Sequence, residues 1–164
     1  MKKYLYNTGD RVVLPPYGVG VVSGISTKCV ANATCSYYQV EFPNGTSKAY
    51  VPVESAANLR PALNEQDVPE ILNRLTQGRY ALPRQWSARH RKVTDILATG
   101  NPFEIATLAA ELRRWNVERG LPDLDRQAFR KALKLIGQEI SELATDGVET
   151  IRDIIQEELQ NDAN

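Results

Sequence analysis

The chain has 164 residues, of which 42% are hydrophobic and 24% are charged, and its formal net charge is zero. A hydrophobic fraction of this size excludes a disordered chain, and the length is enough for one domain or two small ones. No apolar run approaches the ~20 residues that cross a bilayer, and the N-terminus lacks the apolar core of a signal peptide, so we expect a cytoplasmic protein with no membrane partner.

Positive and negative charges are unevenly distributed along the chain. Residues 1–60 carry six basic and three acidic groups, residues 61–138 carry thirteen and nine, and residues 139–164 carry one and eight. A weakly basic body with an acidic end is typical of a protein that contacts nucleic acid on one face only.

Residues 1–60 predict a small β domain. Four runs rich in β-branched and aromatic residues, at 12–14, 19–25, 37–42 and 47–53, predict short strands. Turns are expected at 15–18 and at Pro43-Asn44-Gly45, where Asn-Gly suits the positive φ of a hairpin turn. Four or five short strands in this length indicate a strongly bent barrel of the SH3 or Tudor type.

Residues 61–164 predict a compact all-α domain of about five helices, because apolar residues recur there at spacings of three and four. The expected boundaries are Gly78 at the end of the first helix, Pro83 and Gly100 around the second, Asn101-Pro102 and Gly120 around the third, Asp123 or Asp125 as the cap of the fourth, and the run 148–159 as the fifth. The fold class is therefore α+β, with two domains at 1–60 and 61–164.

The glycines of residues 18–24 resemble a dinucleotide-binding fingerprint, but their context differs. Such a fingerprint follows a strand and opens a helix, whereas prolines precede this one and a β-rich run follows it. The lone histidine, His90, has no partner nucleophile nearby in the sequence, and no pattern pairs carboxylates for acid/base chemistry. We therefore expect no enzyme activity and no cofactor.

The two cysteines, Cys29 and Cys35, flank a stretch at 30–34 that resembles a loop between strands. A bridge between them is geometrically conceivable, but free thiols are expected in a reducing cytosol. Two cysteines and one histidine also cannot supply a conventional four-ligand zinc site, so no metal is expected.

Trp86 is the most informative residue of the chain. It lies within residues 79–92, which contain five basic residues and no acidic one. Most tryptophans anchor a core and most basic runs are solvated, but Pro83 and Ser87 place this ring near a helix start. An aromatic side chain ringed by cations is suited to contacting phosphates and pressing a flat surface against bases.

A second cluster, Arg113-Arg114-Trp115, lies near the end of the third expected helix. Trp115 continues the apolar stripe of that helix, which favours a place in the core. Arg113 and Arg114 flank the stripe, and two alternatives remain for them: favourable charges at a helix C-terminus, or additional phosphate contacts.

Four segments together resemble the CarD/CdnL family of bacterial transcription regulators. They are Gly9-Asp10-Arg-Val-Val-Leu-Pro-Pro-Tyr-Gly18-Val-Gly, Tyr50-Val-Pro52, Trp86-Ser87 with the basic residues that follow, and Glu118-Arg-Gly-Leu121. The first segment is also shared with the polymerase-interacting domain of transcription-repair coupling factors. The four segments occur in the same order as in the family, and the resemblance covers nearly the whole chain.

The resemblance implies that the N-terminal Tudor-like domain binds the lobe of the RNA polymerase β subunit. It also implies that the helical domain contacts promoter DNA at the upstream edge of the transcription bubble. Trp86 matches the family's tryptophan, which inserts at the minor groove there and hinders bubble collapse. Lys28 matches a basic residue at the polymerase interface, and a second such position falls on Tyr50. Ala88 replaces an arginine of some members.

An exposed edge strand around residues 48–51 is expected to pair with a strand of the polymerase. The residues expected to bind polymerase are Lys28, Lys48, Tyr50, Val51 and Pro52. The residues expected to bind DNA are Trp86, Arg84, Arg89, Arg91, Lys92, Arg113 and Arg114. A monomer is expected. The alternatives are a ribosome- or RNA-binding barrel module, which leaves Trp86 and the helical half unexplained, and an enzyme accessory or a hydrolase with an unrecognised site.

Overall fold

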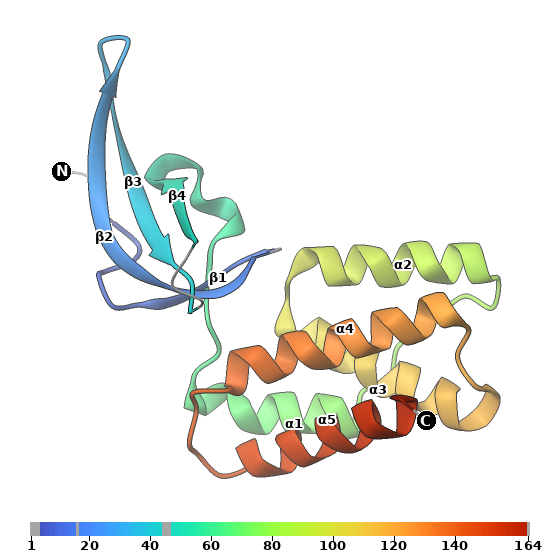
Figure 1. The fold of residues 1–164 in the computed structure, drawn as a ribbon. Coiled ribbons are helices and arrows are strands. Elements are labelled where there is room, and N and C mark those ends of the chain that lie inside the picture. Colours follow the sequence, from blue (N-terminus) through green and yellow to red (C-terminus); the bar gives the residue numbers. More distant parts are fainter. Residues whose placement is uncertain (1–3, 16, 44–46, 164) are drawn as a thin grey trace. The chain divides into compact units, whose positions relative to one another are not determined.

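The computed structural model describes residues 4–15, 17–43 and 47–163, and the chain divides into two compact units between Ala62 and Leu63. The first unit contains an antiparallel five-stranded sheet and the second contains five α-helices (Figure 1). This arrangement confirms the predicted α+β class, with a β domain followed by an all-α domain. No helix among the described residues is long and apolar enough to cross a membrane.

The sheet has the strand order β4-β3-β2-β1-β5, so β4 and β5 form its two edges in the part of the chain that is described. The strands are β1 (Arg11–Leu14), β2 (Gly18–Val30), β3 (Ala33–Glu41), β4 (Lys48–Pro52) and β5 (Arg60–Pro61), with a 3₁₀ helix at Val53–Asn58. The inner face packs a small apolar core that includes Val12, Val22, Tyr38 and Val40, each fully buried.

Strand β2 passes through the glycine-rich segment, which confirms that these glycines do not open a helix. Gly20 is required by close packing, since a Cβ atom there would lie 2.6 Å from Val40 Cγ1 and 2.9 Å from the carbonyl oxygen of Glu41. The register with β3 shifts between Val22 and Gly24. An irregularity of this kind bends a strand, which lets the sheet curve around its core.

The hairpin of β2 and β3 is longer than the sequence predicted. Residues 26–30 and 33–36 are strand, so the connection expected at 30–34 lies there but is shorter than predicted. The connection is a two-residue turn in which Ala31 and Asn32 have φ of 50° and 66°. Cys29 lies opposite Thr34, whereas Cys35 lies opposite Lys28, so the two cysteines point to opposite faces of the hairpin. Both are free thiols, as expected.

The N-terminal unit extends slightly beyond its predicted end at residue 60. Arg60 and Pro61 pair with Val13 and Val12 of β1, which adds β5 to the sheet and moves the division to Ala62. The predicted turn at 43–45 lies mostly outside the described residues, as does Pro16 of the turn at 15–18.

The five helices of the second unit match the predicted number and order. They are α1 (Val68–Gln77), α2 (Trp86–Thr99), α3 (Pro102–Arg119), α4 (Asp123–Ile140) and α5 (Val148–Ala163). Asn101 caps α3 as predicted, because its side chain accepts hydrogen bonds from the amides of Phe103 and Glu104. The predicted cap of α4 is wrong: Pro122 occupies that position, and Asp125 instead bonds to Arg89.

The helices enclose one apolar core, to which α1, α3 and α4 contribute most of the fully buried side chains. Leu108, Phe129 and Ile136 are examples, and each is at most 1% exposed. Gly78 allows the close approach of α1 and α3, since a Cβ atom there would lie 3.0 Å from the Cα of Thr107. Contacts of Arg89 with Asp125 and Trp115 place the first turns of α2 next to the start of α4 and the end of α3.

Candidate functional site

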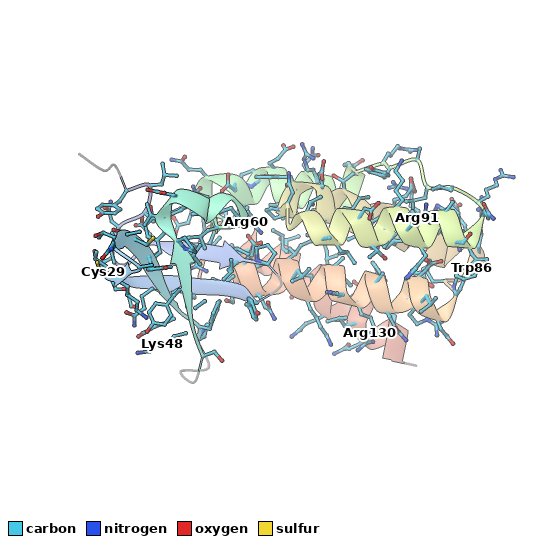
Figure 2. All side chains as sticks on the ribbon, turned by 90° about the horizontal axis from the view of Figure 1, so that it is seen from above. Cys29, Lys48, Arg60, Trp86, Arg91 and Arg130 are labelled. Carbon is cyan, nitrogen blue, oxygen red and sulfur yellow. The ribbon has the colours of Figure 1, made fainter. Side chains whose placement is uncertain are left out.

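Trp86 is the first residue of α2, and 61% of its surface is exposed (Figure 2). The prediction that it lies near a helix start is therefore confirmed, although the helix begins three residues after Pro83. The preceding residue, Gln85, has extended backbone and makes no side-chain capping bond among the described residues. A large aromatic side chain is usually buried, so an exposed one at a helix end marks a candidate contact surface.

Three of the predicted phosphate-binding residues are exposed to solvent. Arg84 precedes Trp86, and Arg91 and Lys92 follow it on α2. Trp86 and Arg91 are labelled in Figure 2. The Lys92 Nζ lies 5.2 Å from the centroid of the Tyr80 ring, which orients its ammonium group without burying it. These three cations surround Trp86 in sequence and are available to anionic ligands.

Arg89 differs from its basic neighbours because it is buried, with only 4% of its surface exposed. Its guanidinium forms an ion pair with Asp125 at 2.8 Å and donates to the carbonyl oxygen of Arg84 at 2.9 Å. A cation engaged in this way cannot reach a phosphate, so the expectation that Arg89 contacts DNA does not fit the structure. No local sequence pattern indicates this burial, because the partner of Arg89 lies on another helix.

Arg113 and Arg114 also bind within the helical unit. The Arg113 guanidinium lies 2.8 Å from the Glu158 carboxylate on α5, and Arg114 lies 3.3 Å from Glu111 on its own helix. Arg114 also donates to the carbonyl oxygen of Gly78. Of the two alternatives for these arginines, these contacts favour a structural role.

Trp115 is half-buried and packs against the helical core, as its place in the apolar stripe predicts. The guanidinium carbons of Arg89 and Arg119 lie 4.8 Å and 4.5 Å from the centroid of its ring. These contacts bring the end of α3 next to the start of α2. Sequence reasoning missed Arg119 and Asp125 as neighbours of the Trp86 segment, because the contacts span three helices.

Two exposed apolar residues near the turn between α3 and α4 were also missed. Val117 is 81% exposed and Leu124 is 45% exposed. Val117 falls outside the three-and-four spacing of the buried residues on α3, and this irregularity was a usable signal in the sequence. The Arg89–Asp125 pair joins this turn to the start of α2, so both residues belong to the same end of the helical unit as Trp86.

In the N-terminal unit, most of the predicted polymerase-binding residues share the outer face of the sheet, which is the face opposite its apolar core. Tyr50 lies opposite Gln39, and Lys28 lies opposite Cys35, which places both on the face that points away from Tyr38. Lys48 and Pro52 lie two residues before and two residues after Tyr50 on β4, so they share that face. Val51 points inward and is only 8% exposed, so it can offer a partner only its backbone.

The edge strand β4 pairs with β3 on one side, and none of the described strands pairs with its other side. This is the exposed edge expected around residues 48–51. Lys48 forms an ion pair with Glu41 at 3.3 Å across the two strands. The outer face therefore combines a free strand edge, an exposed aromatic ring and a cation.

The described residues contain no group of three or more His, Cys, Asp or Glu side chains that could hold a metal ion. His90 lies on α2, and its buried Nδ1 makes no hydrogen bond with any described residue. The described residues present two candidate contact surfaces, one on the outer face of the sheet and one around Trp86.

Both units resemble known domains. Residues 6–63 match the family described as the CarD-like/TRCF RID domain, and residues 70–156 match the CarD C-terminal domain. A protein of Bacillus subtilis (strain 168), named "Putative transcription factor YdeB", is 23% identical over 159 residues, which is 96% of this chain and 99% of that protein. The first match ends one residue beyond the first unit, and the second match lies within the second unit.

Proposed function

This chain belongs to the CarD family of transcription regulators, and we propose that it binds the lobe of the RNA polymerase β subunit and stabilises the promoter open complex. The observation that carries the proposal is the exposed Trp86 ring at the first position of α2, with exposed cations on both sides. We further propose that the protein acts as a cytoplasmic monomer whose first unit holds polymerase while its second contacts DNA.

The exposed ring suits the upstream edge of the transcription bubble. Opening DNA costs unstacking energy of about a few kcal/mol per base step, and an apolar wedge offsets part of this cost. The wedge helps only where the duplex has already begun to open, so it favours the open complex over the closed one. A shift of ~1.4 kcal/mol changes that equilibrium tenfold.

The cations near Trp86 need only weak affinity for DNA. Arg84, Arg91 and Lys92 carry no base-reading pattern, and phosphate contacts are independent of sequence. Binding of the N-terminal unit to polymerase would deliver the second unit to the promoter. Such tethering raises the effective concentration, so a few phosphate contacts are sufficient.

The outer face of the sheet is the proposed polymerase-binding surface. The edge strand β4 offers backbone groups for pairing with a partner strand, which gives affinity without a demand on the partner's sequence. Lys28 and Tyr50 stand beside that edge and would contact side chains of the lobe. Val51 contributes through its backbone, because its side chain is part of the core.

The proposal is tested by measuring the half-life of open complexes formed with the Trp86→Ala protein. The half-life should fall by about threefold to tenfold, in line with the loss of one apolar wedge. Binding to polymerase should be unaltered, since it uses the other unit. Lys134→Ala, which changes an exposed residue in the middle of α4, is a control and should keep the parental half-life. An unaltered half-life in a folded Trp86→Ala protein that binds polymerase would refute the wedge.

A further inference from the structure

Three consecutive carbonyl groups, those of Pro83, Arg84 and Gln85, accept hydrogen bonds from Arg89. The Arg89 guanidinium Nη1 donates to the oxygens of Pro83 at 3.4 Å and Arg84 at 2.9 Å, and its backbone amide donates to Gln85 at 2.9 Å. Only the last is an ordinary first bond of a helix. Arg89 therefore secures the backbone that leads directly into Trp86.

The Arg89 guanidinium is itself fixed from the far side. Its Nε and Nη2 lie 2.9 Å and 2.8 Å from one carboxylate oxygen of Asp125, and both side chains are about 95% buried, at 5% and 4% exposure. Asp125 lies in the first turn of α4, where the helix dipole favours a negative charge. The planar fork of an arginine can hold the carboxylate and the carbonyl groups at the same time.

Trp115 covers this ion pair, since its ring centroid lies 4.8 Å from the Arg89 guanidinium carbon. Covering the pair limits access of water, which strengthens charge-assisted hydrogen bonds. The start of α2 is thus connected to α4 through Asp125 and to α3 through Trp115. This connection fixes the backbone from which the Trp86 side chain extends, although the Trp86 ring itself is exposed to solvent.

We infer that the Arg89–Asp125 pair is a positioning device that holds residues 83–85 and so presets the orientation of the Trp86 ring. This inference rests on the proposed function, because the proposed function is what gives the oriented Trp86 ring a role at the opening DNA duplex. A ring that is already oriented loses less conformational freedom on insertion than a mobile one. Arg89 acts through Trp86 and makes no contact with DNA itself.

Removing one partner would leave a buried charge uncompensated, so the test removes both. The double variant Arg89→Met, Asp125→Leu replaces the pair with apolar side chains of similar volume, a change that folded proteins commonly tolerate. It eliminates the donors to Pro83 and Arg84. Arg89→Lys is a second variant, which keeps the charge beside Asp125 but lacks the fork that spans both sets of partners.

The first readout is the nanosecond mobility of Trp86 by fluorescence anisotropy decay. The chain has two tryptophans, so the measurement is made in a Trp115→Phe background, where Trp86 is the remaining one. The reference protein and both variants carry this same change. The mobility of the Trp86 ring should rise in the double variant and in Arg89→Lys, while the circular dichroism spectrum of each variant remains the same as that of the folded parent protein. Parental mobility in both variants would overturn the positioning role, whatever the DNA measurements show.

The second readout is the open-complex half-life of the full-length protein with polymerase. The double variant should lower it by about threefold or more, and adding Trp86→Ala should lower it no further. A purely structural role predicts instead an additional fall in the Trp86→Ala background, and that result would overturn the inference. If Trp86→Ala alone leaves the half-life unaltered, the proposed function fails, and the anisotropy decides the positioning role independently.

Discussion

Lys28 and Tyr50 meet on the outer face of the N-terminal sheet, where the Lys28 Nζ lies 4.9 Å from the centroid of the Tyr50 ring. The two residues belong to β2 and β4, which are separated by β3. Their contact crosses the intervening strand and joins the long hairpin to the sheet edge. The cation and the ring therefore form one surface rather than two independent sites.

We predict that Lys28→Glu weakens binding to the polymerase β lobe by about tenfold, because it replaces the cation of this surface with a like-sized anion. Its stability should change by no more than about 0.5 kcal/mol, since Lys28 is exposed. Lys131→Glu, which alters an exposed lysine of α4, is the matched control and should bind normally. Unaltered lobe binding in both Lys28→Glu and Tyr50→Glu proteins would mean that another face binds polymerase.

The parts of the fold that carry apolar periodicity or cap residues could be predicted from the sequence. Val12, Tyr38 and Val40 mark strands by alternation, and Asn101 marks the start of α3. The outer half of the β2–β3 hairpin could not be predicted in this way. Residues 27–29 and 33–35 are exposed on both faces and the turn between the strands lacks glycine, so neither alternation nor turn chemistry distinguishes this part from a loop.

The candidate site was only partly predictable for a different reason. The exposure of Trp86 followed from local signals, namely the nearby proline and the basic run. The burial of Arg89 depends on Asp125, which is 36 residues away in the sequence. An arginine among arginines looks like a surface cation until its partner is known, because ion-pair geometry is a tertiary property.

Arg91 and Lys92 provide a test of the phosphate contacts. Changing either to Glu should weaken DNA engagement at many promoters alike, and should reduce the salt dependence of the open complex by about one unit of slope per lost contact. Lys134→Glu changes an exposed lysine further along α4 and should leave the slope unaltered. Effects limited to particular promoter sequences would indicate base readout instead.

Tyr6 links the stability of the N-terminal unit to pH. Burial, followed by the neighbouring Tyr38 and Asp10, raises the pKa of Tyr6 above its ordinary value of 10.0. The folded state therefore retains the phenolic proton, so this contribution is fully present below the unfolded pKa. It is lost as the pH rises through the folded pKa. The free energy of unfolding should accordingly decrease at alkaline pH.

We predict that Tyr6→Phe removes part of this decrease in the free energy of unfolding at alkaline pH. At neutral pH the variant should be less stable by about 1 kcal/mol, because the Tyr6 hydroxyl no longer donates to the carbonyl oxygen of Leu59. Urea titrations followed by tyrosine fluorescence, at neutral and alkaline pH, measure both effects. Tyr17→Phe changes an exposed tyrosine and serves as the control. An identical alkaline loss in the Tyr6→Phe and parent proteins would contradict this assignment.

The two tryptophans should differ sharply in what their removal does to stability. Trp115 packs on the helical core and lies over two guanidinium groups, so Trp115→Ala should lower the free energy of unfolding by about 3 kcal/mol. Trp86 is 61% exposed, so Trp86→Ala should change it by no more than about 0.5 kcal/mol. Thermal melts of both variants measure this contrast.

The same pair of variants separates a surface role from a core role when melts are compared with open-complex half-lives. Trp86→Ala should shorten the half-life without a change in Tm, and Trp86→Phe should retain part of the effect because flat apolar area fills the unstacked step. Trp115→Ala should lower Tm, and it should also shorten the half-life of the folded protein, because it removes the ring that packs on Arg89. A large drop in Tm for Trp86→Ala would place its ring in the core and end the wedge hypothesis, since the exposed position on α2 is what the hypothesis requires.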